Sequence, residues 1–290
     1  MQHDTDAYPL FGCITGFTLP EESFELAAGV SLHRGYFDVF SAPMMAFGPP
    51  IAPALHNPAP WMAVRGGMTS FSSRVELRIE ELETFNPLPS STVAWLVAAL
   101  FRLRVSAPVR VPAVANIPLR KLADIPGANA TSFEGGQHQV GWFRQGLLEA
   151  TTEELLWVKM VLPRAVSLYH HDRFMRAFSI FDDASWSSRF ELATTLIWTA
   201  VEILFDKSAT QHKAKEIASA LSDFVAHSPS DRDKAYNVIR DLYEKRGRVV
   251  HVGSKIDPND YGQSLALARA AFVNVLTRDE LPPSHKSKKH

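Results

Sequence analysis

The chain has 290 residues, of which 46% are hydrophobic and 21% are charged, a composition that excludes a disordered, collagen-like or disulfide-rich chain. The formal net charge is −1, so the chain as a whole has no electrostatic attraction for nucleic acid, and any RNA-binding surface must be local. The single cysteine, Cys13, excludes an intramolecular disulfide and a cysteine-based zinc cluster. The N-terminus carries no apolar signal segment, and the longest apolar run, Val93 to Phe101, is far shorter than the ~20 residues of a membrane span. We therefore expect a cytoplasmic protein without a membrane segment.

Prolines crowd the first half of the chain, and long helices cannot pass through them. Between the prolines, residues 75–80 (VELRIE) alternate between apolar and charged side chains, the period of a half-buried strand. Residues 103–105 and 109–111 repeat this alternation weakly. Residues 90–100 predict one capped, buried helix. The sequence thus predicts a β-rich α+β domain over residues 1–141.

A glycine-rich polar segment, residues 129–141, marks a boundary after which apolar residues recur at helical spacing. We expect five helices. The first runs from Glu153 to about Phe178 and starts or kinks at Pro163, and the second and third cover Trp186–Phe205 and Lys213–Val225. The fourth is opened by the N-cap Ser230 and closed by Gly253, and the fifth covers Tyr261–Leu276. In the fourth of these helices, the expected core positions are Tyr236, Ile239, Tyr243 and Val250. We therefore predict an α+β protein in which residues 142–278 form an all-α bundle and residues 279–290 a basic, flexible tail.

No motif for nucleotide, zinc-protease or serine-hydrolase chemistry is present. The run His170-His171-Asp172 contains metal-ligand residue types, but neighbouring side chains on a helix diverge by ~100°. We interpret this run as a surface cluster, and we expect neither a metal site nor a cofactor.

The remaining candidate is an arginine followed by a histidine, Arg246 and His251, near the end of a predicted helix. Similar spacings occur from Arg164 to His170 and from Arg278 to His285, so spacing alone does not select this pair. Its setting is distinctive, because Gly247 follows the arginine directly and a helix C-terminus favours a protonated histidine. On a regular helix, residues five apart are separated by about 140°, so the two side chains converge only if the helix loosens or the arginine curls back.

Residues 242–251 (LYEKRGRVVH) resemble the Leu-Tyr-x-x-Arg-x-x-x-x-His signature of HEPN domains, particularly the Apea-like HEPN group. Residues 196–205 (LIWTAVEILF) resemble that group's tryptophan-containing helix, and residues 42–47 and 58–61 are similar to its N-terminal segments. One departure is Gly247, which stands where family members often have a small polar residue.

The resemblance implies a helical domain that forms a homodimer and acts as a metal-independent endoribonuclease on RNA. Carried over by position, Arg246 and His251 are the catalytic pair: the histidine transfers the proton of the ribose 2′-OH or of the leaving oxygen, and the arginine stabilises the phosphate charge. Glu202, on the neighbouring helix, completes the catalytic set by orienting either of them. Arg248, Lys245 and Tyr243 are assigned to substrate binding. For Arg248 a surface ion pair with Glu244 is the alternative, and we favour the ion pair.

A carboxylate on the apolar helix that carries Glu202 needs a basic partner, and only the ribonuclease hypothesis predicts that this partner is Arg246. The biological roles implied by the resemblance are bacterial antiviral defence or toxin-like growth arrest, with a possible operon-encoded regulator. Two alternatives stay open: a catalytically inactive HEPN protein that serves as an RNA-binding, sensor or assembly module, and an enzyme whose site lies in the N-terminal half.

Overall fold

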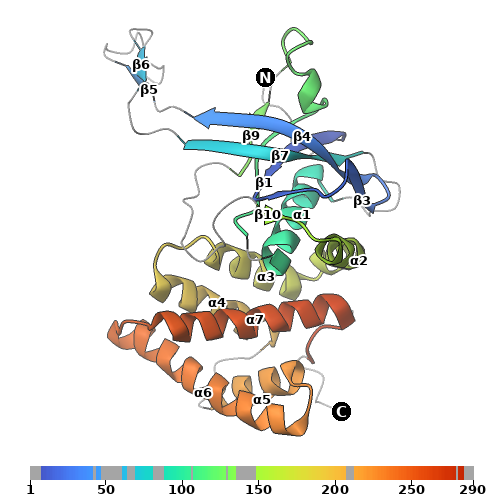
Figure 1. The fold of residues 1–290 in the computed structure, drawn as a ribbon. Coiled ribbons are helices and arrows are strands. Elements are labelled where there is room, and N and C mark those ends of the chain that lie inside the picture. Colours follow the sequence, from blue (N-terminus) through green and yellow to red (C-terminus); the bar gives the residue numbers. More distant parts are fainter. Residues whose placement is uncertain are drawn as a thin grey trace.

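A β-sheet occupies one end of the molecule and a stack of helices the other. In the computed structural model, the sheet lies at the top of Figure 1, α1 and α2 lie beneath it, and the other helices follow below. The structure describes residues 8–41, 44–46, 61–63, 69–80, 88–105, 107–128, 130–134, 148–206, 212–278 and 280–283. The chain is therefore a mixed α+β protein, as predicted from its sequence.

The N-terminal layer is a six-stranded antiparallel sheet in the order β3-β4-β7-β1-β8-β9. Its strands are β1 (Leu10–Thr15), β3 (Ser23–Ala27), β4 (Val30–Ser41), β7 (Thr69–Ile79), β8 (Arg110–Ala115) and β9 (Thr131–Ser132). Two short pairs lie outside this sheet: β5 (Met44–Ala46) with β6 (Trp61–Ala63), and β2 (Phe17–Thr18) in parallel with β10 (Leu148–Glu149). The second pair joins the N-terminal half to the entrance of the helical half.

The alternation predicted over residues 75–80 is confirmed on the apolar face of β7, where all three apolar side chains are fully buried. The charged face differs from the prediction, because Glu76 is only 2% exposed. Its carboxylate accepts hydrogen bonds from Arg78 Nε and from the backbone N–H of Leu119, at 2.6 and 2.9 Å. The 3₁₀ turn η1 (Leu119–Lys121) covers the sheet at this point, so a strand that looks half-buried in sequence is covered on both faces.

Helix α1 (Ser90–Val105) is longer than the helix predicted over residues 90–100. It includes residues 103–105, for which a strand was predicted wrongly, whereas residues 110–111 do begin β8. Buried residues lie on almost every side of α1, so its periodicity does not mark where it ends.

The helices of the C-terminal half are α2 (Thr152–Tyr169), α3 (Asp172–Ala184), α4 (Phe190–Leu204), α5 (Lys213–Val225), α6 (Pro229–Val252) and α7 (Pro258–Arg278). The prediction for α5 is confirmed to the residue. The single helix expected from Glu153 to Phe178 is instead two helices, which break at His170 and His171 and not at Pro163, which lies inside α2.

The N-cap predicted for α6 is also corrected. Ser228, not Ser230, caps the helix, and its hydroxyl accepts a hydrogen bond from the Asp231 N–H at 3.2 Å. Pro229 occupies the first helical position, where its missing N–H costs nothing. At the other end, Gly253 closes the helix with φ of +69°, as the sequence predicted.

Buried apolar side chains from both halves of the chain form one continuous cluster. Helix α2 packs against α1 and β3, and the aromatic rings of α3 pack against Phe272 of α7. Much of the predicted boundary segment, residues 129–141, lies outside the described residues, so a division at residue 141 stays a prediction. The core itself is not divided between the two halves.

The start of the predicted tail is packed against the helices. Leu281 contacts the core, Pro282 is buried, and Arg173 Nη2 donates a hydrogen bond to the carbonyl oxygen of Pro282 at 2.8 Å. Residues 280–283, which were expected to belong to a flexible tail, thus include residues that pack against the helices. Residues 284–290 lie outside the described part of the chain.

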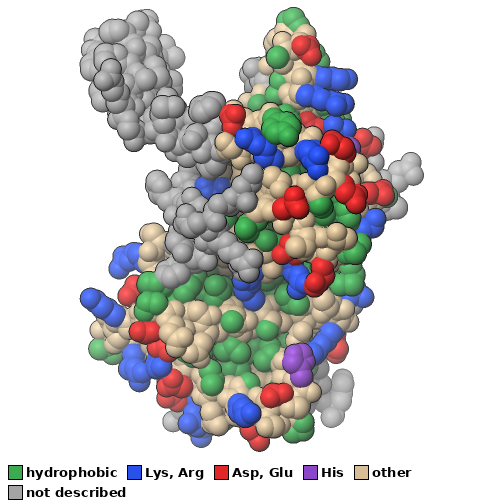
Figure 2. Space-filling model, in the orientation of Figure 1, with side chains coloured by type: hydrophobic (Ala, Val, Ile, Leu, Met, Phe, Trp, Pro, Cys, Tyr) green, Lys and Arg blue, Asp and Glu red, His purple; other side chains and the backbone are tan. Residues whose placement is uncertain are grey.

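None of the described helices is long and apolar enough to cross a membrane. On the face drawn in Figure 2, Lys and Arg side chains lie among Asp and Glu side chains over both the sheet and the helices. The described residues on this face form no broad basic surface for a nucleic acid.

One buried arginine joins α1 to the helical half. Arg102 Nε and Nη2 donate to the two carboxylate oxygens of Asp182 in α3, each at 2.7 Å, and the Arg102 side chain is 2% exposed. Its Nη1 donates to the carbonyl oxygen of Val109 at 2.6 Å and lies 3.3 Å from Glu134 Oε1. Burial alone would lower the pKa of Arg102, but the two carboxylates outweigh it and raise the pKa.

Replacing Arg102 with Met should lower the free energy of unfolding by about 3–5 kcal/mol, because Asp182 would stay buried without its main partner. Arg104→Met is the matched control: Arg104 lies on the same helix and pairs with Glu153, whose side chain is 82% exposed, so the loss should be at most about 1 kcal/mol. Urea denaturation measures both variants. Similar losses in the two variants would show that the buried pair has no special role.

Candidate functional site

Helices α4 and α6 pack together at the residues that the sequence assigned to an active site. Trp198 of α4 is buried and packs edge-on against Tyr243 of α6 with ring centroids 5.4 Å apart. Its indole N–H donates to the hydroxyl of Ser264 in α7 at 3.2 Å. Glu202 lies one turn further along α4 and therefore faces the part of α6 that carries Tyr243 and Arg246.

The carboxylate of Glu202 joins three side chains. Oε1 accepts a hydrogen bond from the Tyr243 hydroxyl at 2.7 Å and lies 3.5 Å from Arg246 Nη2. Oε2 accepts a hydrogen bond from Lys213 Nζ at 2.7 Å. We call Glu202, Lys213, Tyr243 and Arg246 the Glu202 cluster. Its two cations and one anion (+2 − 1) leave a net charge of +1, which suits an anionic ligand.

The sequence predicted a basic partner for Glu202, and the ribonuclease hypothesis predicted Arg246 in particular. The structure brings Arg246 to Glu202 and adds Lys213, which the sequence reasoning missed. Lys213 is the first residue of α5, beyond a turn that follows α4, so helical spacing does not relate it to Glu202.

The guanidinium of Arg246 is only partly engaged by the cluster. Its side chain is 16% exposed, and its central carbon lies 5.8 Å from the centroid of the Tyr243 ring. Its Nε is buried and has no hydrogen-bond partner among the described residues. Arg246 therefore keeps donor capacity that Glu202 does not use.

Tyr243 acts as a donor to the cluster. Burial raises the pKa of its hydroxyl, and the hydrogen bond to Glu202 raises it further. The hydroxyl therefore stays protonated and holds Glu202 Oε1 in place.

His251 makes no contact with the Glu202 cluster within one chain. Helix α6 stays regular from Arg246 to Val252, so Gly247 does not loosen it, and side chains five apart are separated by about 140°. His251 is exposed in the last turn, and its ring has no hydrogen bond or ion pair with any described residue. A single chain thus brings Glu202, Tyr243 and Arg246 together but leaves His251 apart.

Lys245 and Arg248, the other two residues assigned to substrate binding, differ in their contacts. Lys245 Nζ lies 2.9 Å from Asp241 and 2.8 Å from Asp260, so two carboxylates occupy it. Arg248 is exposed and does not form the ion pair with Glu244 that we favoured. Glu244 instead lies 3.9 Å from Arg240, in the preceding turn.

The last turn of α6 exposes apolar side chains. Val250 was predicted to be a core residue but is 46% exposed, and Val252 is 77% exposed. Val250 lies on the same face of α6 as the buried residues Ile239 and Tyr243. However, this end of α6 lies at the left edge of the molecule in Figure 1, where it meets the start of α7. The apolar stripe therefore runs on past the helices that cover it.

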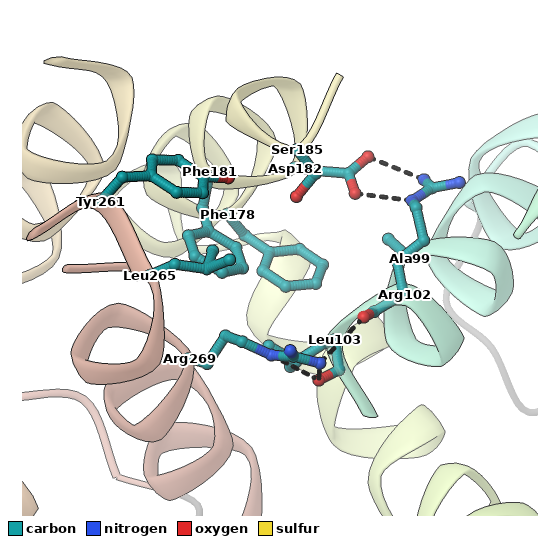
Figure 3. Close-up of a pocket in the computed structure, with 10 residues that line it drawn as sticks. All are labelled: Ala99, Arg102, Leu103, Phe178, Phe181, Asp182, Ser185, Tyr261, Leu265 and Arg269. Carbon is teal, nitrogen blue, oxygen red and sulfur yellow. Dashed lines mark hydrogen bonds and ion pairs between the residues drawn. The ribbon is translucent and has the colours of Figure 1, made fainter. Parts of the chain in front are cut away.

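Two cavities formed by described residues lie elsewhere, and neither Arg246 nor His251 lines them. The cavity in Figure 3 has a volume of about 40 Å³, room for little more than water, and lies between α1, α3 and α7 beside the Arg102–Asp182 pair. The sequence reasoning missed this pair, although an arginine in the apolar stretch of α1 signals a buried partner.

Among the described residues, no group of three or more His, Cys, Asp or Glu side chains could hold a metal ion.

No protein-family model, curated protein or solved structure matches this chain. The resemblance to Apea-like HEPN proteins therefore stays a prediction.

Tyr243 should make the protein less stable in alkaline solution. Because the folded state raises its pKa, the folded state holds the phenolic proton more tightly, and the free energy of unfolding falls as the pH rises above about 10. Tyr243→Phe should weaken the dependence of the free energy of unfolding on pH in this range. Some dependence should remain in both proteins, because burial also raises the pKa of Tyr261, to about 12. At pH 7, Tyr243→Phe should lower the free energy of unfolding by about 1.5–3 kcal/mol, which is the usual contribution of a hydrogen bond to a charged group.

Urea denaturation from pH 7 to about 11 measures both effects. Tyr236→Phe is the control, since Tyr236 lies on the same helix outside the Glu202 cluster. An unchanged pH dependence in Tyr243→Phe would contradict the expected contribution of Tyr243.

Proposed function

We propose that this chain is a metal-independent endoribonuclease of the HEPN type, which cleaves RNA by attack of a ribose 2′-hydroxyl on the adjacent phosphate. The contact between Glu202 and Arg246, at 3.5 Å, is the observation that supports this most directly. Two segments that are far apart in the sequence each resemble the Apea-like HEPN pattern, and their charged residues meet in the fold. A chance resemblance of either segment alone does not predict that contact.

In the proposed reaction, the 2′-oxygen bonds to phosphorus and the bond from phosphorus to the 5′-oxygen of the next nucleotide breaks. The products are a 2′,3′-cyclic phosphate and a 5′-hydroxyl. Neutral His251 accepts the 2′-hydroxyl proton, or its protonated form supplies the proton of the leaving oxygen. Arg246 donates hydrogen bonds to the phosphate oxygens and stabilises the charge that develops there. Glu202 positions Arg246, while Tyr243 and Lys213 hold the Glu202 carboxylate.

Two copies of the chain are proposed to complete the site. In one copy His251 is exposed and separate from Arg246, and the exposed Val250 and Val252 flank it. A symmetric dimer through the ends of two α6 helices would bury these valines. The same arrangement would bring the His251 of one copy toward the Arg246 of the other.

A catalytically inactive module that binds RNA or assembles with a partner is the second candidate. It is favoured by the separation of His251 from Arg246 within one chain and by the two carboxylates that occupy Lys245. The cytoplasmic location, the role in defence or growth arrest and the operon-encoded regulator belong to the same proposal and stay predictions.

The purified protein should cleave single-stranded RNA in EDTA and leave 2′,3′-cyclic phosphate ends. His251→Ala should lower the cleavage rate by about 10²–10⁴-fold, the usual contribution of general acid–base catalysis, and Glu202→Gln should lower it by releasing Arg246. His227→Ala, which removes an exposed histidine after α5, is the control and should cleave normally. Undiminished cleavage by His251→Ala would overturn the site, and an intact wild-type protein that cleaves no RNA would favour the inactive module.

Val250→Asp should convert a dimer into a monomer, because it places a charge in the proposed interface. Size-exclusion chromatography with light scattering measures the mass, and the cleavage assay should show a parallel loss of activity. Val238→Asp is the matched control: Val238 is 41% exposed on α6 but far from the helix end. A wild-type protein that is monomeric and active would contradict the shared site.

A further inference from the structure

A larger cavity lies between α1, α2 and α3, away from the Glu202 cluster. Its volume is about 300 Å³, at the lower end of the range for small-molecule sites. Aromatic rings, hydroxyl groups and one carboxylate line it. The described side chains that carry the argument are Thr92 and Trp95 of α1, Phe133 after β9, Tyr169 at the end of α2, and Ser179 and Asp183 of α3.

Neighbouring groups hold the Trp95 ring in place. Its centroid lies 6.2 Å from that of Tyr169 and 5.7 Å from that of Phe178, both edge-on. Its indole N–H donates to Asp182 Oδ2 at 3.0 Å, and Asp182 is itself fixed by Arg102. The cavity therefore has a rigid aromatic wall.

Asp183 is the charged residue among the described side chains that line the cavity. Its side chain reaches solvent, and its carboxylate has no hydrogen bond or ion pair with any described residue. Partial burial raises the pKa of Asp183, and the neighbouring charge of Asp182 raises it further, although Arg102 lowers it. Among the described residues, Asp183 therefore has no direct ion-pair partner, whereas Asp182 beside it is paired with Arg102.

We propose that this cavity binds a small organic ammonium compound. Its charged nitrogen would lie between the Asp183 carboxylate and the face of Trp95, and its apolar body would pack against Phe133 and Tyr169. Aromatic faces attract cations, and a hydrogen bond from an ammonium group to a carboxylate is among the stronger ones. The hydroxyl oxygens of Thr92 and Ser179 can accept further N–H donors.

The charges around the cavity argue against an anionic ligand. No Lys or Arg is among the described residues that line it. The N-terminal end of α1 contributes a partial positive charge of roughly half a unit, which the full charge of ionised Asp183 exceeds. The carboxylate of Asp183 would therefore repel a phosphate-bearing ligand, which disfavours an RNA contact at this cavity. The proposal does not depend on the ribonuclease activity.

Isothermal titration calorimetry with 2-phenylethylamine and with 2-phenylethanol tests the proposal, because the two compounds differ mainly in replacing the ammonium group with a hydroxyl group. We expect the full-length protein to bind the amine on the order of tenfold or more tightly than the alcohol at pH 7. Asp183→Asn should weaken binding of the amine by a similar factor and leave binding of the alcohol nearly unchanged.

Asp233→Asn is the matched control, because it removes an exposed carboxylate from α6, outside the cavity, and should bind the amine normally. Thermal unfolding shows whether Asp183→Asn is folded, and its midpoint should be no lower than that of the wild type, since the substitution removes a charge that is repelled by Asp182. Equal binding of amine and alcohol, or an Asp183→Asn variant that is folded and binds the amine as the wild type does, would overturn the proposal. So would the absence of amine binding at millimolar concentration.

Discussion

The paired hydrogen bonds between Arg102 and Asp182 are the interaction on which most of the architecture depends. Removing two charges from water is costly, and the cost is offset here because both carboxylate oxygens are occupied and every nitrogen of the guanidinium has a partner. The same guanidinium reaches Val109 and Glu134, and Glu134 in turn accepts the backbone N–H of Val111 in β8. One side chain thereby ties α1 to α3, to the edge of the sheet and to the segment after β9. Through Asp182 it also fixes Trp95, the wall of the larger cavity.

The sequence predicted best those elements that have one apolar face. Helix α5 is amphipathic and its bounds were predicted correctly, whereas β1 was not anticipated, because all of its residues are buried and no alternation marks them. The strand predicted at residues 103–105 belongs to α1 for a similar reason, since apolar residues surround that helix. Val250 illustrates another limit: periodicity identifies the face of a helix, but it does not reveal how far the neighbouring helices extend along it.

At the candidate site, the sequence predicted the pairing of Glu202 with Arg246, because a carboxylate on an apolar helix requires a basic partner and the resemblance supplied one. It could not supply Lys213, which lies on another helix, α5, so that no helical spacing relates it to Glu202. Nor could it place His251, whose relation to Arg246 depends on whether the helix stays regular through Gly247. Asp183 carries no local signal at all, because its neighbours in the cavity come from α1, α2 and the segment after β9.

The undivided core determines whether the helical half can be separated from the rest of the chain. Helices α2 and α3 bury part of their apolar surface against α1 and the sheet, and β10 pairs with β2 just before α2 begins. If the helical half were excised, this surface would be exposed to water, and Asp182 would lose Arg102. The helical half is therefore not a portable module. The N-terminal half supports the proposed RNA site structurally even though it contributes none of the site's side chains.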